Sequence, residues 1–321
     1  MNIVVTGSIA FDYLMTFPGR FAEHILANQI DRLSVSFLVD EMRKQRGGCA
    51  ANIAYNLALL GESPRLMGSV GRDFGAYRAA LEAIGVDTSL VRDELDLFTA
   101  SFFVSTDLDG NQIANFYTGA MARARELSLH DLPRGRIDLV IISPNDPEAM
   151  VNYVAECREL GLPYLYDPSQ QIVRLSGEDL TAGLKGAKIL VVNEYEFEML
   201  REKTGLPASD IRAAPSSACV VTRGAEGSHI WTRDGTYQIP VATPGCAGDP
   251  TGVGDAYRAG LVKGLALDLP WDLAGRIGSV AASYALEQPG PQGHRYSLTG
   301  FLTRYQAQFG ENPELVASFR V

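Results

Sequence analysis

Basic residues are scarce in this chain. It has 28 Lys and Arg against 38 Asp and Glu, which gives a formal net charge of −10 over 321 residues. Proteins that bind nucleic acid or anionic membranes present a basic surface. We therefore expect neither kind of partner, whereas a small anionic ligand held by a few local groups remains compatible with this charge.

Cysteine and histidine are also few, with four of each. No C-x-x-C spacing occurs, and the cysteines stand far apart in the sequence, at Cys49, Cys157, Cys219 and Cys246. In a chain of this length, scattered cysteines are typical of reduced thiols. We expect neither a disulfide framework nor a zinc site.

Long hydrophobic runs are missing as well. Apolar stretches such as Leu139–Ile142 are far shorter than the roughly 18 residues of a membrane span. The first residues, MNIVV, show neither the basic region nor the cleavage site of a signal peptide. We expect no targeting segment and a cytoplasmic location.

What the sequence does contain is an alternation of short apolar runs and longer helical patterns, with 46% hydrophobic residues. The expected strands are Ile3–Thr6, Leu139–Ser143, Tyr164–Asp167, Ile189–Asn193, Cys219–Thr222 and Ser228–Thr232. The expected helices are Cys49–Leu60, Tyr77–Ile84, Pro147–Leu160, Glu194–Thr204, Asp255–Leu267 and Trp271–Glu287. Continuous apolar strands alternating with helices predict an α/β fold, with a mostly parallel sheet covered on both faces.

Two segments interrupt this pattern. Phe98–Thr106 and Gln112–Tyr117 are β-prone and are joined by a loop that contains Asp109-Gly110, a strong hairpin signal. Residues 15–43 do not read as a strand–helix unit. We expect a single domain over residues 1–321, with a small β-sheet lid formed by about 14–43 and 97–118. The terminal stretch 311–321 is expected to fray.

The strongest chemical signal is a glycine-rich turn, residues 248–255, which reads GDPTGVGD and leads into a helix. Free N–H groups and the dipole at a helix start bind anions, and glycines let the backbone approach a ligand. Asp255 would stand beside the anion, where it can take a proton from an attacking hydroxyl in phosphoryl transfer. The alternative is structural, with Asp255 as a helix N-cap and Gly252 and Gly254 as a turn. No Gly-Lys-Ser or Gly-Lys-Thr follows, so the turn is not a Walker A loop.

Two further segments place polar groups where α/β proteins bind ligands. The pair Gly47-Gly48 opens a helix with Asn52 near its start, and this amide can bind a ligand or cap the local backbone. Asp12 follows the first strand, where it can accept hydrogen bonds from vicinal hydroxyls or cap a turn.

A third segment, Asn193 and Glu196, also follows an expected strand. Magnesium keeps several waters and takes few protein ligands, so these side chains can orient its hydration shell. As isolated residues they are equally consistent with a helix cap.

Together these segments resemble the ribokinase-like (PfkB) family of carbohydrate and nucleoside kinases, over nearly the whole chain. The motifs are Gly47-Gly48 with Asn52, Asn193-x-x-Glu196, Thr222-Arg223-Gly224 with Gly227, and Asp249-x-Thr251-Gly252-x-Gly254-Asp255. Residues 17–25, 115–121 and 167–170 make the chain most similar to adenosine or broad-specificity nucleoside kinases. The resemblance implies a ribokinase-like fold and a kinase that uses ATP and Mg²⁺.

The resemblance also implies a role for each motif residue. Asp255 is the general base for a nucleoside 5′-hydroxyl, and the amides of Gly252, Val253 and Gly254 hold the transferred phosphoryl group. The ribose hydroxyls are bound by Asp12, Gly48 and Asn52. The nucleotide and magnesium side consists of Asn193 and Glu196, which act on the metal through water, together with Thr222, Gly224, Gly227 and Thr251.

Four points stay open at this stage. Gln29, Phe116 and Met121 either touch a base under the lid or pack within it. Many family members hold a potassium-type cation beside the anion site, here near Asp249, and the sequence does not decide whether this chain does. The alternatives to a nucleoside kinase are a sugar kinase for ribose, fructose or a relative, and a non-catalytic nucleoside- or nucleotide-binding protein. Monomer and homodimer are both compatible with the sequence.

Overall fold

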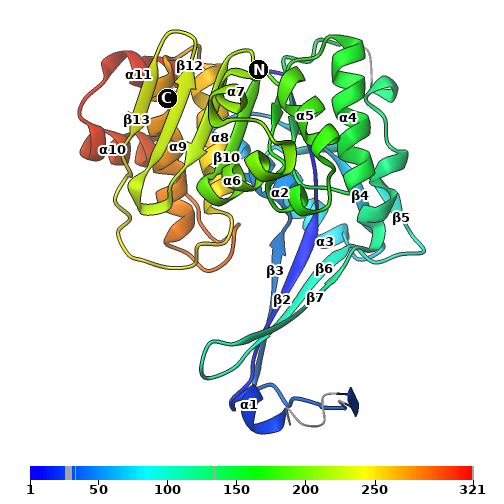
Figure 1. Cartoon of the computed structure of the whole chain (residues 1–321). Helices are drawn as coiled ribbons and strands as arrows, with labels where there is room; N and C mark the ends of the chain where they lie inside the picture. The colour runs from blue at the N-terminus through cyan, green and yellow to red at the C-terminus, as the bar shows by residue number, and fades with distance from the viewer. Residues whose placement is uncertain (26–30, 33, 133–134, 320–321) are drawn as a thin grey trace.

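The computed structural model describes residues 1–25, 31–32, 34–132 and 135–319. Within them, the main structural feature is a sheet of nine strands (Figure 1). Neighbouring strands are parallel, except that the last two join antiparallel at one edge. In spatial order the strands are β13 (Thr236–Ile239), β12 (Ser228–Thr232), β11 (Ala218–Thr222), β10 (Ile189–Asn193), β9 (Tyr164–Tyr166), β8 (Leu139–Ile142), β1 (Ile3–Thr6), β4 (Arg65–Gly71) and β5 (Asp87–Glu94).

Helices cover both faces of this sheet, as expected. One face packs against α2 (Cys49–Leu59), α3 (Gly75–Glu82), α8 (Val253–Ala266) and α9 (Trp271–Leu286). The other packs against α4 (Pro147–Leu160), α5 (Gly177–Gly186), α6 (Glu194–Thr204) and α7 (Ala208–Ala213). In β1, Val5 lies in the first of these cores and Val4 in the second. Both faces of the strand are thus buried, which explains its unbroken apolar sequence.

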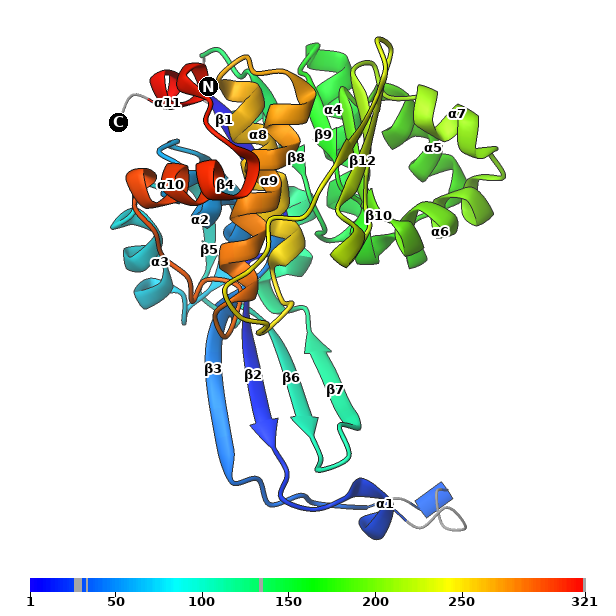
Figure 2. The same cartoon turned by 90° about the vertical axis from the view of Figure 1, so that its left-hand side faces the viewer.

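A second sheet projects from the main body, with α1 (Phe21–His24) at its far end (Figure 2). Its strands, in spatial order, are β3 (Glu41–Gly47), β2 (Ala10–Thr16), β6 (Ala100–Thr106) and β7 (Gln112–Tyr117). The expected hairpin is confirmed as the antiparallel pair β6–β7, whereas β2 and β6 are parallel. That this small sheet acts as a lid stays a prediction.

The expected fraying of the C-terminus is wrong for the residues described. After α10 (Leu298–Phe309), the chain forms α11 (Pro313–Ser318), and Leu315 and Phe319 are buried in a cluster with α9 and α10. Burial of these two side chains keeps α11 packed against the protein, although the segment is short and its other residues are mostly polar. Within the described ranges, every helix is too short or too polar to cross a bilayer.

The packing of α8 against α9 fixes the position of the glycine-rich turn, because α8 begins directly after that turn. The two helices approach very closely where Gly260 faces Gly278: a Cβ atom on Gly260 would lie 2.6 Å from the Cα atom of Gly278. Backbone-to-backbone contact of this kind leaves no room for a methyl group.

We therefore expect Gly260→Ala to lower the free energy of unfolding by about 1–3 kcal/mol, the usual cost of overpacking a core. Urea denaturation of the purified protein measures this change. Gly75→Ala is the control, because Gly75 lies at the start of α3 with open space around its Cα atom. Equal stability of the two variants would contradict the packing argument.

Candidate functional site

A cavity of about 410 Å³ lies where the small sheet joins the carboxyl end of the main sheet. Eight positions named from the sequence line it: Asp12, Gly48, Asn52, Phe116, Met121, Thr251, Gly252 and Asp255. The remaining lining residues are Ser8, Ala10, Cys49, Phe102, Pro144, Gln170 and Gln171. Segments far apart in the sequence thus converge on one cavity, while Gln29 lies outside the described residues.

The first turn of α8 forms one wall of this cavity. Gly252, the residue that caps the helix, has a φ of +79°, and a Cβ atom there would overlap Pro291. The amide of Val253 donates to the Pro250 carbonyl at 3.3 Å, whereas the amides of Gly252 and Gly254 have no acceptor within the described part of the chain. Free N–H groups at a helix start are suited to an anion.

Asp255 is buried at the start of α8 and accepts a hydrogen bond of 2.9 Å from Nδ2 of Asn52. The structural alternative for Asp255 is wrong, because the cap position is Gly252 and no side chain caps this helix. Burial raises the pKa of Asp255 to about 6, although Arg258 and the Asn52 hydrogen bond act in the opposite direction. A carboxylate with this pKa is well placed to act as a base near neutral pH.

Asn52 is held from both ends of its amide. Its Oδ1 atom accepts a 2.9 Å hydrogen bond from Gln292, which leaves Nδ2 to face Asp255. Gln292 also hydrogen-bonds the hydroxyl of Tyr77, which donates to the Gly47 carbonyl at 3.0 Å. The geometry therefore shows Asn52 orienting Asp255, and its expected contact with ribose stays a prediction. Neither Gln292 nor Tyr77 belongs to a motif, so neither residue was predicted from the sequence.

Asp12, on β2, points its carboxylate toward Gly47, where a Cβ atom would lie 2.5 Å from Oδ2. The next glycine, Gly48, has a φ of +93°, and a Cβ atom there would lie 2.5 Å from the Ser8 carbonyl oxygen. The glycine pair thus lets α2 start close to β2. Burial and the nearby charge of Asp249 raise the pKa of Asp12 to about 6.

Asn193 and Glu196 form a reciprocal cap at the start of α6. The Glu196 amide donates to the Asn193 side chain, and the Asn193 amide donates to the Glu196 carboxylate, both at 2.8 Å. Ser169 adds a third hydrogen bond, of 3.0 Å, to Glu196. The cap is therefore present, and the expected action on magnesium stays a prediction. Thr222 lies beside Asn193 in register on β11.

Several other predicted residues lie outside the cavity lining: Val253, Gly254, Thr222, Gly224, Gly227 and Asp249. The Asp249 carboxylate accepts hydrogen bonds of 2.9 Å from the amides of Thr251 and Gly290. Partial burial raises the pKa of Asp249, but these bonds outweigh it and lower the pKa overall. Asp249 thus ties the glycine-rich turn to the loop that carries Gln292. No cluster of three metal-ligating side chains occurs in the described residues.

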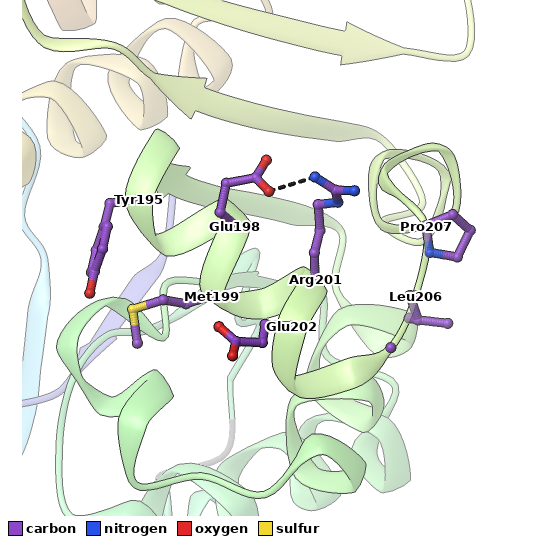
Figure 3. A pocket seen from close by; sticks show the side chains of 8 residues that line it. Tyr195, Glu198, Met199, Arg201, Glu202, Leu206 and Pro207 are labelled. Atoms are coloured by element: carbon purple, nitrogen blue, oxygen red, sulfur yellow. Dashed lines mark hydrogen bonds and ion pairs between the residues drawn. The ribbon is translucent and has the colours of Figure 1, made fainter.

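A larger hollow, of about 590 Å³, lies along α6 away from this cavity. Figure 3 shows that its sides are formed by Tyr195, Glu198, Met199, Arg201 and Glu202, with Glu198 paired to Arg201. It contains neither a glycine-rich turn nor a buried carboxylate. The smaller cavity is therefore the candidate site, because it alone of the two combines those features.

Comparisons with known proteins show the family of the chain. Residues 6–295 match the family described as pfkB family carbohydrate kinase. A nucleoside kinase of Methanothermobacter thermautotrophicus is 31% identical over 319 residues, which is 98% of each chain. A second, from Methanocaldococcus jannaschii, is 30% identical over 293 residues, or 91% of this chain and 92% of that protein. The solved structure of Burkholderia thailandensis nucleoside kinase in complex with inosine is 36% identical, with a TM-score of 0.86, over 97% of this chain and 99% of that one.

The raised pKa of Asp255 predicts a dependence of stability on pH. Its pKa is about 6 in the folded chain against an ordinary value of 3.8, so between these pH values the folded state binds more protons than the unfolded state. Burying the charged carboxylate therefore lowers stability as pH rises through this window. We expect Asp255→Asn to stabilise the protein relative to wild type by a few kcal/mol more at pH 7.5 than at pH 4, since each pKa unit corresponds to about 1.4 kcal/mol.

Chemical denaturation of both proteins at the two pH values measures this difference. A stability difference between variant and wild type that does not change with pH would show that Asp255 is not a buried, titrating carboxylate.

Proposed function

The chain belongs to the pfkB family of carbohydrate kinases, is an ATP-dependent kinase with a ribokinase-like fold, and, we propose, phosphorylates the 5′-hydroxyl of a nucleoside such as adenosine or inosine. The observation that carries this proposal is the position of Asp255. Its buried carboxylate lines the same cavity as the free-amide turn and the aromatic side chains of the small sheet.

The proposed reaction needs three things from the protein. Asp255 accepts the proton of the nucleoside 5′-hydroxyl while the hydroxyl oxygen attacks the γ-phosphorus of ATP. The bond from that phosphorus to the β,γ-bridging oxygen breaks, and ADP leaves. The amides of Gly252 and Gly254, at the positive end of the α8 dipole, stabilise the negative charge of the transferred phosphoryl group. Asp12, across the cavity, accepts hydrogen bonds from the ribose hydroxyls and so holds the 5′-oxygen in line.

Magnesium fits this site as an ion held mostly by phosphate oxygens and water. The Glu196 oxygens each accept one hydrogen bond and keep a free lone pair, so Glu196 and Asn193 can order magnesium-bound waters. When bound, the ion neutralises charge on the phosphates of ATP. Thr222, beside Asn193 in the sheet, and the turn at Gly224 and Gly227 are the proposed nucleotide side.

The proposal includes a monovalent cation near Asp249. Each carboxylate oxygen of Asp249 accepts one backbone amide and keeps a free lone pair, so this side chain can hold the loop and still face a cation. Backbone carbonyl oxygens would supply the other ligands. The expected cytoplasmic location stays a prediction.

The walls of the cavity favour a nucleoside over a free sugar. Phe102 and Phe116 are cross-strand neighbours on the same face of the small sheet, and both line the cavity together with Met121. A flat, apolar base can stack on such a surface, whereas ribose or fructose alone would need polar partners there.

Turnover tests this function directly. We expect ADP release from ATP with purine nucleosides such as adenosine and inosine to exceed that with ribose or fructose. Asp255→Asn should lower kcat by about 10² to 10⁴, the usual contribution of a general base, with little change in KM. A coupled ADP-release assay over a panel of nucleosides and sugars measures both effects. Strong turnover on ribose or fructose alone would favour a sugar kinase, and near-normal turnover by the variant would refute Asp255 as the base.

The base-stacking wall gives a second prediction. Phe116→Ala should raise KM for nucleosides by about tenfold, because stacking on an aromatic ring contributes about 1–3 kcal/mol per base. Its neighbour Tyr117 is the matched control: it is on the same strand, points to the opposite face and has a similar exposed fraction, 43% against 50%. Tyr117→Ala should leave KM unchanged. Equal effects of the two substitutions on KM would contradict a contact between Phe116 and the base.

A further inference from the structure

A buried ion pair stands behind the glycine-rich turn. Nη2 of Arg258, on α8, donates to Oδ1 of Asp167 at 2.6 Å, and their side chains are only 8% and 1% exposed. Asp167 follows β9, so the pair joins α8 to the carboxyl edge of the main sheet. Taking two charges out of water is costly, and such a pair is often no more stabilising than apolar side chains of similar size. Its presence beside the candidate site therefore calls for a reason other than stability.

The guanidinium of Arg258 lies against the first turn of α8. Helical side chains lean toward the N-terminus of their helix, and Arg258 follows Gly254 by four residues, on the same face. A Cβ atom on Gly254 would lie 2.7 Å from Nη1 of Arg258. The positive charge thus sits directly behind the free amide of Gly254 and one turn from Asp255.

The pair is also incompletely satisfied. Nε of Arg258 and Oδ2 of Asp167 are buried and have no hydrogen-bond partner within the described residues. Buried polar atoms are almost always paired, and an exception calls for an explanation, of which a catalytic role is one. An ion pair that served only stability would be expected to be bidentate, with two guanidinium nitrogens donating to the two carboxylate oxygens.

We propose that Asp167 and Arg258 are positioning residues, in which Asp167 fixes the guanidinium of Arg258 behind Gly254 so that its charge keeps Asp255 ionised and adds to the positive field of the phosphoryl-binding turn. The effect on turnover rests on the proposed function, whereas the effect on the charge of Asp255 does not depend on it.

The charged groups around Asp255 predict how the pKa of Asp255 responds when the pair is changed. Arg258 is the cation that opposes the burial of Asp255, whereas Glu196, from α6, raises the pKa of Asp255. Burial raises the pKa of Asp167 to about 7, with Arg258 acting in the opposite direction and the charges of Glu196 and Asp255 adding to the rise. The other titratable groups that sense Asp255 are Cys49 from α2 and Tyr77 from α3, and burial raises the pKa of both. Both are therefore neutral near pH 7.

Removing either member of the pair should therefore raise the pKa of Asp255. Arg258→Met removes the attraction, so the pKa of Asp255 should rise by about one unit or more. Asp167→Asn releases the guanidinium from its place behind Gly254, so the pKa of Asp255 should also rise, by less than in Arg258→Met because the positive charge is still present. Arg258→Lys keeps the positive charge and should stay close to wild type.

The experiment follows the Asp255 carboxyl carbon by ¹³C NMR as a function of pH in the substrate-free protein, with Asp255→Asn to assign the resonance. In parallel, the acid limb of kcat/KM is measured with the best nucleoside. We expect Arg258→Met to show about fivefold lower kcat/KM at pH 6, with recovery above pH 8, because raising the pKa of Asp255 from about 6 by about one unit lowers its ionised fraction at pH 6 from about one half to about one tenth.

Arg258→Met leaves an uncompensated carboxylate and can fail to fold, so the double variant with Asp167→Asn provides a second comparison. Its Asp255 midpoint should lie above that of Asp167→Asn alone. A pKa of Asp255 that falls or stays unchanged in Asp167→Asn, or an equal loss of kcat/KM at every pH in Arg258→Met, would overturn the proposal. A raised Asp255 midpoint in both single variants of a protein that phosphorylates no nucleoside would uphold the pair and refute only the proposed function.

Discussion

The hydrogen bond between Asn52 and Asp255 connects two segments that are 203 residues apart and makes one site of them. Asn52 belongs to the helix that starts at the glycine pair, and Asp255 to the helix that starts at the glycine-rich turn. Gln292 determines which end of the Asn52 amide faces Asp255. Because Gln292 lies on the loop that Asp249 holds through the Gly290 amide, the orientation of Asp255 depends on contacts well outside the cavity.

The site concentrates buried negative charge at the expense of stability. Burial raises the pKa of Asp12, Asp167 and Asp255 to between about 6 and about 7, so each carboxylate costs free energy when it is ionised in the folded state. Arg258 is the buried cation that offsets part of this cost. Folding alone gives no reason for such a cluster, whereas a reaction that needs a poised base does.

The small sheet has a different task. One face lines the cavity with Phe102 and Phe116 and the other carries Phe103 and Tyr117, so only alternate residues can contact a substrate. Because this sheet projects from the main sheet, its position over the cavity is set by the segments where the two sheets meet. There Gly71 passes the backbone of Phe98 and Thr99 too closely to leave room for a side chain.

The amino-acid sequence by itself determined the α/β class, most strands of the main sheet and the two glycine motifs. Continuous apolar runs and glycine-rich helix starts are local patterns, and local patterns can be read along a chain. It did not reveal β4, because RLMGSVG carries glycines that are required only by a neighbouring backbone. It also misjudged the C-terminus, since α11 depends on the burial of Leu315 and Phe319 in a distant cluster.

At the site, the sequence named the residues that belong to motifs, and the tertiary structure decided what they contact. Asn52 and Asp255 were both identified, but nothing in the sequence shows that one holds the other. Gln292, Tyr77 and the Asp167–Arg258 pair carry no motif of their own. Their roles come from partners that only folding brings within hydrogen-bonding distance, because such contacts depend on position in space and leave no periodic or compositional trace.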